Sequence, residues 1–106
     1  MTTWIRVADR YELAPGEFRV VFDGDTAIAV FNVDGAFHAI EDVCTHDGGD
    51  LAGGCIDGFA VECPRHGARF DVRTGAVLAP PALVPVAVML VRVEDEGIWT
   101  RDPRND

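Results

Sequence analysis

The chain has 106 residues, with 18 aspartates and glutamates against 9 lysines and arginines, and a formal net charge of −9. This length allows one domain of average size, so we expect residues 1–106 to form a single domain. The negative charge disfavours nucleic-acid binding, because phosphate backbones are negative too. No stretch approaches the ~20 apolar residues of a membrane span, and the N-terminus lacks the pattern of a signal peptide. We therefore expect no membrane association and a cytoplasmic location.

The chain contains three cysteines, an odd number. Structural disulfides are rare in the cytosol, and secreted disulfide scaffolds carry an even and denser set. The cysteines are therefore expected to bind metal, to act in catalysis or to be simply buried. Cys55, alone in an apolar part of a loop, is expected to be a small buried hydrophobic residue.

The first part of the chain consists of short runs of β-prone residues. Strands are predicted over residues 4–7, 18–22, 26–33 and 36–40, with a connection at 10–16. Asp34-Gly35 separates the last two runs and predicts a type I′ hairpin, because both residues tolerate positive φ.

The second part of the chain contains two predicted loops, about 42–58 and 63–69. The first is rich in glycine and aspartate and is long for a structureless connection, which is typical of a functional loop. Strands are predicted over 59–63, 69–72, 76–78, 86–93 and 98–101. No segment shows a helical period of ten or more residues. The sequence therefore predicts an all-β, antiparallel sandwich or barrel with both loops on one side.

The two loops carry the residues that point to chemistry. Cys44-Thr45-His46 lies in the first loop and Cys63-Pro64-Arg65-His66 in the second, with sixteen residues between the two motifs. Each loop therefore offers one thiolate and one imidazole. Together they supply two sulfur and two nitrogen ligands for a metal.

Two metal centres fit this set of ligands. A mononuclear zinc ion accepts two cysteines and two histidines in a tetrahedron, and a Rieske-type [2Fe–2S] cluster places two cysteines on one iron and two histidines on the other. Zinc fingers pair like residues at short spacing, whereas each motif here is mixed. The mixed motifs favour the two-iron cluster, and a structural zinc site stays as an alternative.

At these residues the sequence resembles the Rieske [2Fe–2S] family, over nearly the whole chain. The segment from Cys63 to Asp71, with the Thr-Gly pair at 74–75, is similar to the second cluster loop and the strand that follows it. Pro80-Pro81 stands where the family has a proline-containing loop near the cluster. The resemblance implies a Rieske fold with a two-loop cluster-binding subdomain and one cluster per chain. It implies that Cys44 and Cys63 hold the buried iron and that His46 and His66 hold the outer iron.

The sequence departs from the high-potential members of the family at three positions. Those members join the two loops by a disulfide, but the corresponding residues here are Gly49 and Arg65. They also place a serine after the second His-Gly pair, where this chain has Ala68. With fewer hydrogen bonds to the cluster, the potential is expected toward the low end of the Rieske range of about −150 to +300 mV.

This combination resembles the soluble Rieske-type ferredoxins. It implies a monomeric one-electron carrier, not itself an enzyme, that passes electrons from a flavin-containing ferredoxin reductase to a terminal aromatic-ring-hydroxylating oxygenase or another acceptor. No residue is expected to be catalytic, because only His38 remains for a second iron site that would need two histidines. The small subunit of a nitrite reductase and an accessory ferredoxin of another redox or iron–sulfur assembly pathway stay as alternatives.

Overall fold

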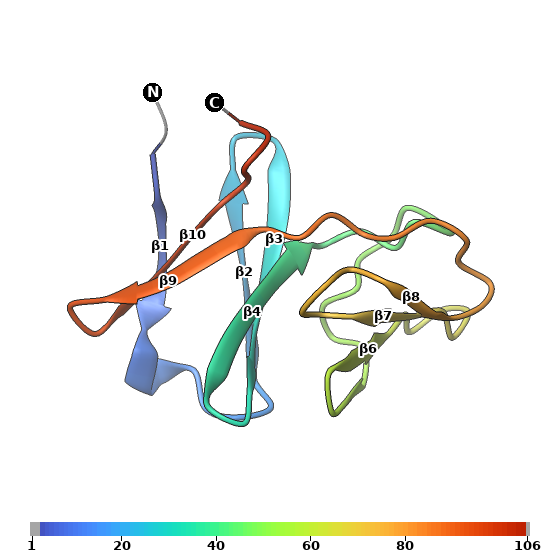
Figure 1. Ribbon diagram of the computed structural model, residues 1–106, viewed down its shortest axis with the longest axis horizontal. Helices are drawn as coiled ribbons and strands as arrows, with labels where there is room; N and C mark the ends of the chain where they lie inside the picture. The colour runs from blue at the N-terminus through green and yellow to red at the C-terminus, as the bar shows by residue number, and fades with distance from the viewer. Residues whose placement is uncertain (1–2, 106) are drawn as a thin grey trace.

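The computed structural model describes residues 3–105, which form ten short strands and one 3-10 turn (Figure 1). The turn, Arg10–Glu12, begins at Asp9, whose side chain accepts a hydrogen bond from the Tyr11 amide. The strands are β1 (Ile5–Asp9), β2 (Phe18–Asp23), β3 (Thr26–Val33), β4 (Ala36–Glu41), β5 (Ile56–Asp57), β6 (Ala60–Glu62), β7 (Arg69–Asp71), β8 (Val77–Ala79), β9 (Leu90–Glu94) and β10 (Gly97–Arg101).

The strands form three antiparallel sheets. Their orders are β1-β10-β9, β2-β3-β4 and β5-β6-β7-β8. The first two sheets lie at the end of the molecule near the termini, and the third lies at the opposite end (Figure 1). The prediction of an all-β antiparallel fold is confirmed.

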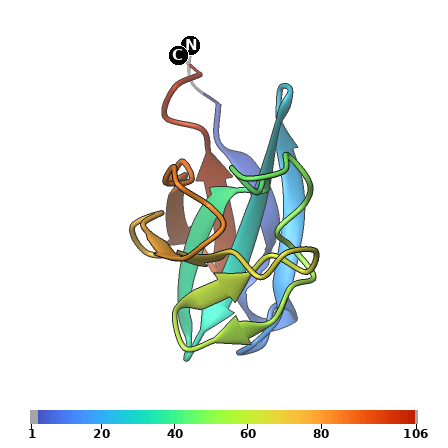
Figure 2. The same cartoon turned by 90° about the vertical axis from the view of Figure 1, so that its right-hand side faces the viewer.

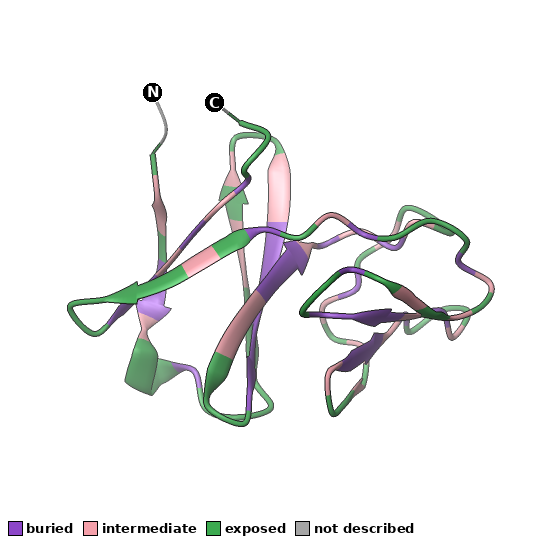
Figure 3. Ribbon diagram, in the orientation of Figure 1, coloured by how far each residue is buried: buried purple, intermediate pink, exposed green. Residues whose placement is uncertain are grey.

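Strand β3 connects the two halves of the molecule, because its side chains alternate between two cores. Ile28 and Val30 pack in a core with Ile98 of β10, whereas Ala29 and Phe31 pack in a second core with residues of the β5–β8 sheet. Every residue from 28 to 33 is therefore buried, and the burial is visible along β3 in Figure 3. The middle sheet thus gives the β5–β8 subdomain a fixed base.

The predicted hairpin at Asp34-Gly35 is confirmed. The two residues have φ of 52° and 92°, and β3 and β4 pair up to the turn, with Val33 opposite Ala36. Positive φ at both central residues is the geometry of a type I′ turn, which suits the twist of the flanking strands.

Three elements differ from the sequence expectations. The connection at 10–16 contains the 3-10 turn, and the loop at 42–58 contains the short strand β5. The strand predicted over 86–93 begins only at Leu90, because residues 86–89 have several partners in turn. The Val86 amide donates to Gly75 O, Val88 forms an isolated bridge with Ile40, and the Met89 amide donates to Ala39 O. This segment crosses from one subdomain to the other. Within residues 3–105, no helix is long and apolar enough to cross a membrane.

Candidate metal centre

The first loop folds back on its own cysteine. The Cys44 amide donates a hydrogen bond of 2.7 Å to Gly49 O, and the Gly48 amide donates one of 2.7 Å to Cys44 O. Gly48 has a φ of 78°, a conformation that a residue with a side chain adopts only at a cost. The loop therefore closes in a tight turn that begins at Cys44.

The second loop repeats this arrangement residue for residue. The Cys63 amide donates to Ala68 O at 2.7 Å, and the Gly67 amide donates to Cys63 O at 3.1 Å. Gly67, four residues after its cysteine like Gly48, has a φ of 79°. Two segments of different sequence thus adopt the same backbone turn after a cysteine.

Polar contacts hold the first loop to the rest of the protein. The buried Asp42 carboxylate accepts hydrogen bonds from the amides of Leu51 and Ala52 through one oxygen, at 2.8 and 2.7 Å. The Thr45 hydroxyl donates to Val84 O at 2.5 Å. Asp42 therefore closes the loop at its base, and Thr45 ties its tip to the segment after Pro80-Pro81.

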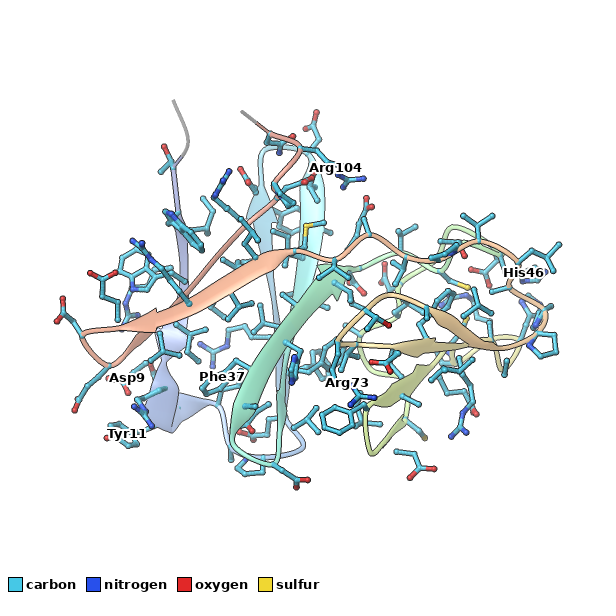
Figure 4. The ribbon with its side chains drawn as sticks, viewed as in Figure 1. Asp9, Tyr11, Phe37, His46, Arg73 and Arg104 are labelled. Atoms are coloured by element: carbon cyan, nitrogen blue, oxygen red, sulfur yellow. The ribbon has the colours of Figure 1, made fainter. Side chains whose placement is uncertain are left out.

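The four predicted ligands lie together and separate by chemistry. Cys44 and Cys63 are 0% and 1% exposed and belong to the same core as Phe70. His46 and His66 are exposed, and their ring centroids lie 5.1 Å apart with the rings nearly perpendicular. Figure 4 shows His46 at the end of the molecule farthest from Asp9 and Tyr11, and Figure 2 views that end. The sulfurs thus face the core and the imidazoles face solvent.

Asp47 lies between these ligands, and the sequence did not single it out as a site residue. Its carboxylate oxygen and the ligand atoms of Cys44 and Cys63 lie within 4.8 Å of one another, as do those of His46, Asp47 and His66. The sequence offered only one signal, the position of Asp47 directly after His46. Its place is set by a partner in the other loop, Arg65.

Asp47 and Arg65 form an ion pair at the site. Hydrogen bonds from Arg65 are the main reason why the pKa of the Asp47 carboxyl lies well below its usual range. The same pairing raises the pKa of Arg65. Burial is the main cause that raises the pKa of the Cys44 thiol, and the nearby Cys63 thiol adds to it. A thiol in this position needs a cation to become a thiolate at neutral pH, and a bound metal supplies one.

The remaining cysteine and histidine lie outside this group. Cys55 is exposed, so the expectation that it is buried was wrong. The backbone contacts of its neighbours turn it outward: Cys55 O accepts from the Glu62 amide, and Gly54 lies against Glu62 O. His38 packs edge-on against Phe59, with the ring centroids 5.8 Å apart.

Comparison with known proteins assigns the chain to a family. The family model described as "Rieske [2Fe-2S] domain" matches residues 3–90. The chain belongs to the Rieske [2Fe–2S] family. Membership implies a Rieske-type [2Fe–2S] cluster, and the two loops that carry the Cys-His motifs lie inside the matched range.

Relatives within the Rieske family include small ferredoxin subunits that the chain matches over most of their length. The chain is 40% identical over 97 residues to the biphenyl dioxygenase ferredoxin subunit of Pseudomonas sp. (strain KKS102), covering 91% of this chain and 89% of that one. Such relatives are electron-transfer components of dioxygenase systems and not the catalytic enzymes themselves.

Two solved structures have the same fold. A chain in the complex of a reduced oxygenase and an oxidised ferredoxin in carbazole 1,9a-dioxygenase superposes with a TM-score of 0.89 at 36% identity, covering 93% of each chain. A nitrite reductase small subunit from Mycobacterium tuberculosis, described as putative and NADH-dependent, superposes with a TM-score of 0.81 at 27% identity, covering 94% of each chain. The dioxygenase ferredoxins are the more similar group.

Proposed function

We propose that this protein is a one-electron carrier whose Rieske cluster is held by Cys44, His46, Cys63 and His66, one cluster per chain. The observation that carries the proposal is the matched pair of loops, each with a buried thiol and an exposed imidazole. In this proposal residues 1–106 act as a single Rieske domain, supported by the middle sheet that contributes to both cores.

The chemistry of the donor set fits a Rieske cluster. Such a cluster uses two cysteines on one iron and two histidines on the other. Here the two thiols lie in an apolar core, and the two imidazoles lie at the surface with their rings in contact. A structural zinc site would enclose all four ligands in one closed tetrahedron, which the separation of thiols and imidazoles does not favour. The cluster, when bound, supplies a reversible one-electron couple.

The residues of the chain determine how a partner reaches that couple. His46 and His66 lie at the tip of the molecule, so a partner's cofactor approaches closely across a small contact. Leu83 is 89% exposed and Val84 is 58% exposed. The carbonyl oxygen of Val84 accepts a hydrogen bond from the hydroxyl of Thr45, the residue before His46. These apolar side chains are suited to contact a partner briefly without a large buried interface.

We propose a terminal oxygenase as the electron acceptor and a flavoprotein ferredoxin reductase as the donor. The carbazole dioxygenase complex, which contains a ferredoxin and an oxygenase, supports the first partner. The net charge of −9 favours partners with basic docking faces, because opposite charges accelerate encounter. We propose that the carrier acts as a monomer. A role as a nitrite reductase subunit is less well supported, at 27% identity to that neighbour.

Ligand substitution and reconstitution test this function together. Cys44→Ser and His66→Ala are expected to lose the visible absorption of the cluster and all electron transfer from a reductase to an aromatic-ring dioxygenase. Cys55→Ser and His38→Gln are matched controls of the same residue types and are expected to retain both. A Cys44→Ser variant with an unchanged spectrum contradicts the assignment, and a wild-type protein that holds the cluster but reduces no oxygenase contradicts the proposed partner.

A further inference from the structure

The side chain of Arg65 extends from the second loop to the first. Its Nε donates to Asp47 Oδ2 at 2.7 Å, and its Nη2 donates to Asp47 Oδ1 at 3.1 Å and to Asp50 O at 2.8 Å. Two of these bonds form a fork from a guanidinium to a carboxylate, and the third goes to a backbone carbonyl. An arginine is suited to this task, because its donors lie in one plane at fixed angles.

The first loop is shaped to receive this guanidinium. A Cβ atom on Gly49 would lie 2.4 Å from Arg65 Cζ, so any side chain at this position would displace the arginine. The Gly49 amide also donates to Asp47 Oδ1 at 2.9 Å. The carboxylate is therefore held in place by its own loop, ready for Arg65, and the close approach of Gly49 leaves room for the guanidinium.

The other side-chain contacts between the two turns involve the ligands themselves. Asp47 Oδ2 lies 3.8 Å from Cys63 Sγ and 3.1 Å from His66 Nδ1. Both of these atoms belong to residues that bind the cluster in the proposed function, so neither contact can hold the loops in the loaded protein. The contacts of Arg65 use no atom of the four ligand residues.

We propose that Arg65 is a positioning residue that ties the two ligand loops together through Asp47 and Asp50 and thereby slows loss of the cluster. This inference rests on the proposed function, because it assumes that the loops hold a cluster. Arg65 is not one of the proposed ligands and acts through its hydrogen bonds to Asp47 and Asp50. Its side chain is 36% exposed and that of Asp47 is 17% exposed, so the pair is partly shielded from water.

The rate of cluster release measures this role. Protein loaded with cluster is mixed with a chelator, and the decay of visible absorption is followed for Arg65→Gln, Asp47→Asn and the double variant. Each single variant is expected to release the cluster roughly three- to tenfold faster than wild type, the range for a forked, partly shielded pair. The double variant is expected to be no faster than Arg65→Gln, because both changes remove the same link.

Two further variants separate the tie from a general effect of charge. Arg69→Gln is the matched control: Arg69 is 35% exposed and pairs with Asp57 and Glu62 at 3.4 Å, within the β5–β8 sheet. It is expected to release the cluster at the wild-type rate. Arg65→Lys keeps the charge but has no fork, and it is expected to fall between wild type and Arg65→Gln.

The reduction potential gives a second readout that a purely structural role would not move in this pattern. Arg65→Gln leaves the Asp47 charge uncompensated near the cluster and is expected to lower the potential, whereas Asp47→Asn is expected to raise it. The double variant is expected to return close to the wild-type potential while still releasing the cluster fast. The same set of variants thus separates the effect of charge on the reduction potential from the effect of the Arg65–Asp47 link on the release rate.

Several results overturn the inference. An Arg65→Gln release rate equal to wild type, or equal to that of Arg69→Gln, removes the role of Arg65. Fully additive effects of Arg65→Gln and Asp47→Asn remove their coupling. By contrast, the inference is supported if Arg65→Gln takes up no cluster while Arg69→Gln does, because the link is then needed to hold the cluster at all. A wild-type protein that binds no Rieske cluster contradicts the proposed function as well, which distinguishes the two failures.

Discussion

Replacement of Asp42 tests how the first loop is held. Asp42 is 8% exposed, and its carboxylate accepts hydrogen bonds from the amides of Leu51, which is fully buried, and Ala52, which is half-buried. A hydrogen bond to a charged group contributes about 1.5–3 kcal/mol. Asp42→Ala removes the one oxygen that accepts both bonds and is expected to cost about 3 kcal/mol. This is the sum of two bonds at the low end of the range, because water can reach the Ala52 amide. This is a large share of the ~5–15 kcal/mol that stabilise a domain.

The assay is thermal unfolding of the cluster-loaded protein, followed by circular dichroism at one fixed scan rate so that the midpoints of the variants are comparable. In a domain of this size 3 kcal/mol corresponds to a fall in midpoint of about 10–20 °C. Asp42→Asn retains an oxygen that can accept both bonds but carries no charge, so it is expected to lose about half as much. Asp25→Ala, at an exposed position in the turn after β2, is the control and is expected to change little. A midpoint for Asp42→Ala within about 4 °C of wild type, or equal to that of Asp25→Ala, would show that Asp42 does not hold the first loop.

Three further predictions concern pH, thiol reactivity and salt. Hydrogen bonds from Arg104 lower the pKa of the buried Asp102 to about 2, below its ordinary value of 3.8. The carboxylate therefore stabilises the fold above about pH 4, and this contribution is lost as the pH falls toward 2. Unfolding midpoints should show that Asp102→Asn is less stable than wild type at neutral pH and that the difference shrinks below pH 4. A thiol reagent should label the loaded protein at Cys55 alone, because Cys44 and Cys63 are buried; labelling of Cys55→Ser at the same rate would contradict this. Electron transfer from a reductase should slow as ionic strength rises, since the charge of −9 is screened, and salt-independent rates would exclude steering.

The ligands could be predicted because their information is local. Mixed Cys-His spacing within two glycine-rich segments restricts the metal chemistry, whatever the rest of the chain does. Alternation of apolar residues and the Asp34-Gly35 turn likewise indicate strands and a hairpin from short windows of sequence. The all-β class follows from these local signals.

Other features depend on residues far apart in the chain and could not be predicted. The tie between Asp47 and Arg65 joins positions 18 residues apart, and neither residue alone indicates it. The apolar segment before β9 has the composition of a continuous strand, yet its partners lie in two different subdomains. Cys55 is apolar by type but is turned outward by backbone contacts with Glu62. In each case a tertiary contact outweighs the local preference.

Electron paramagnetic resonance of the purified, dithionite-reduced protein tests the assignment of the cluster. We expect a red-brown protein whose reduced form gives one Rieske-type [2Fe–2S] signal per chain, with an average g value below that of the free electron. The same signal should disappear on stoichiometric oxidation by one electron and return on reduction. A colourless protein that contains zinc and gives no signal would contradict the account.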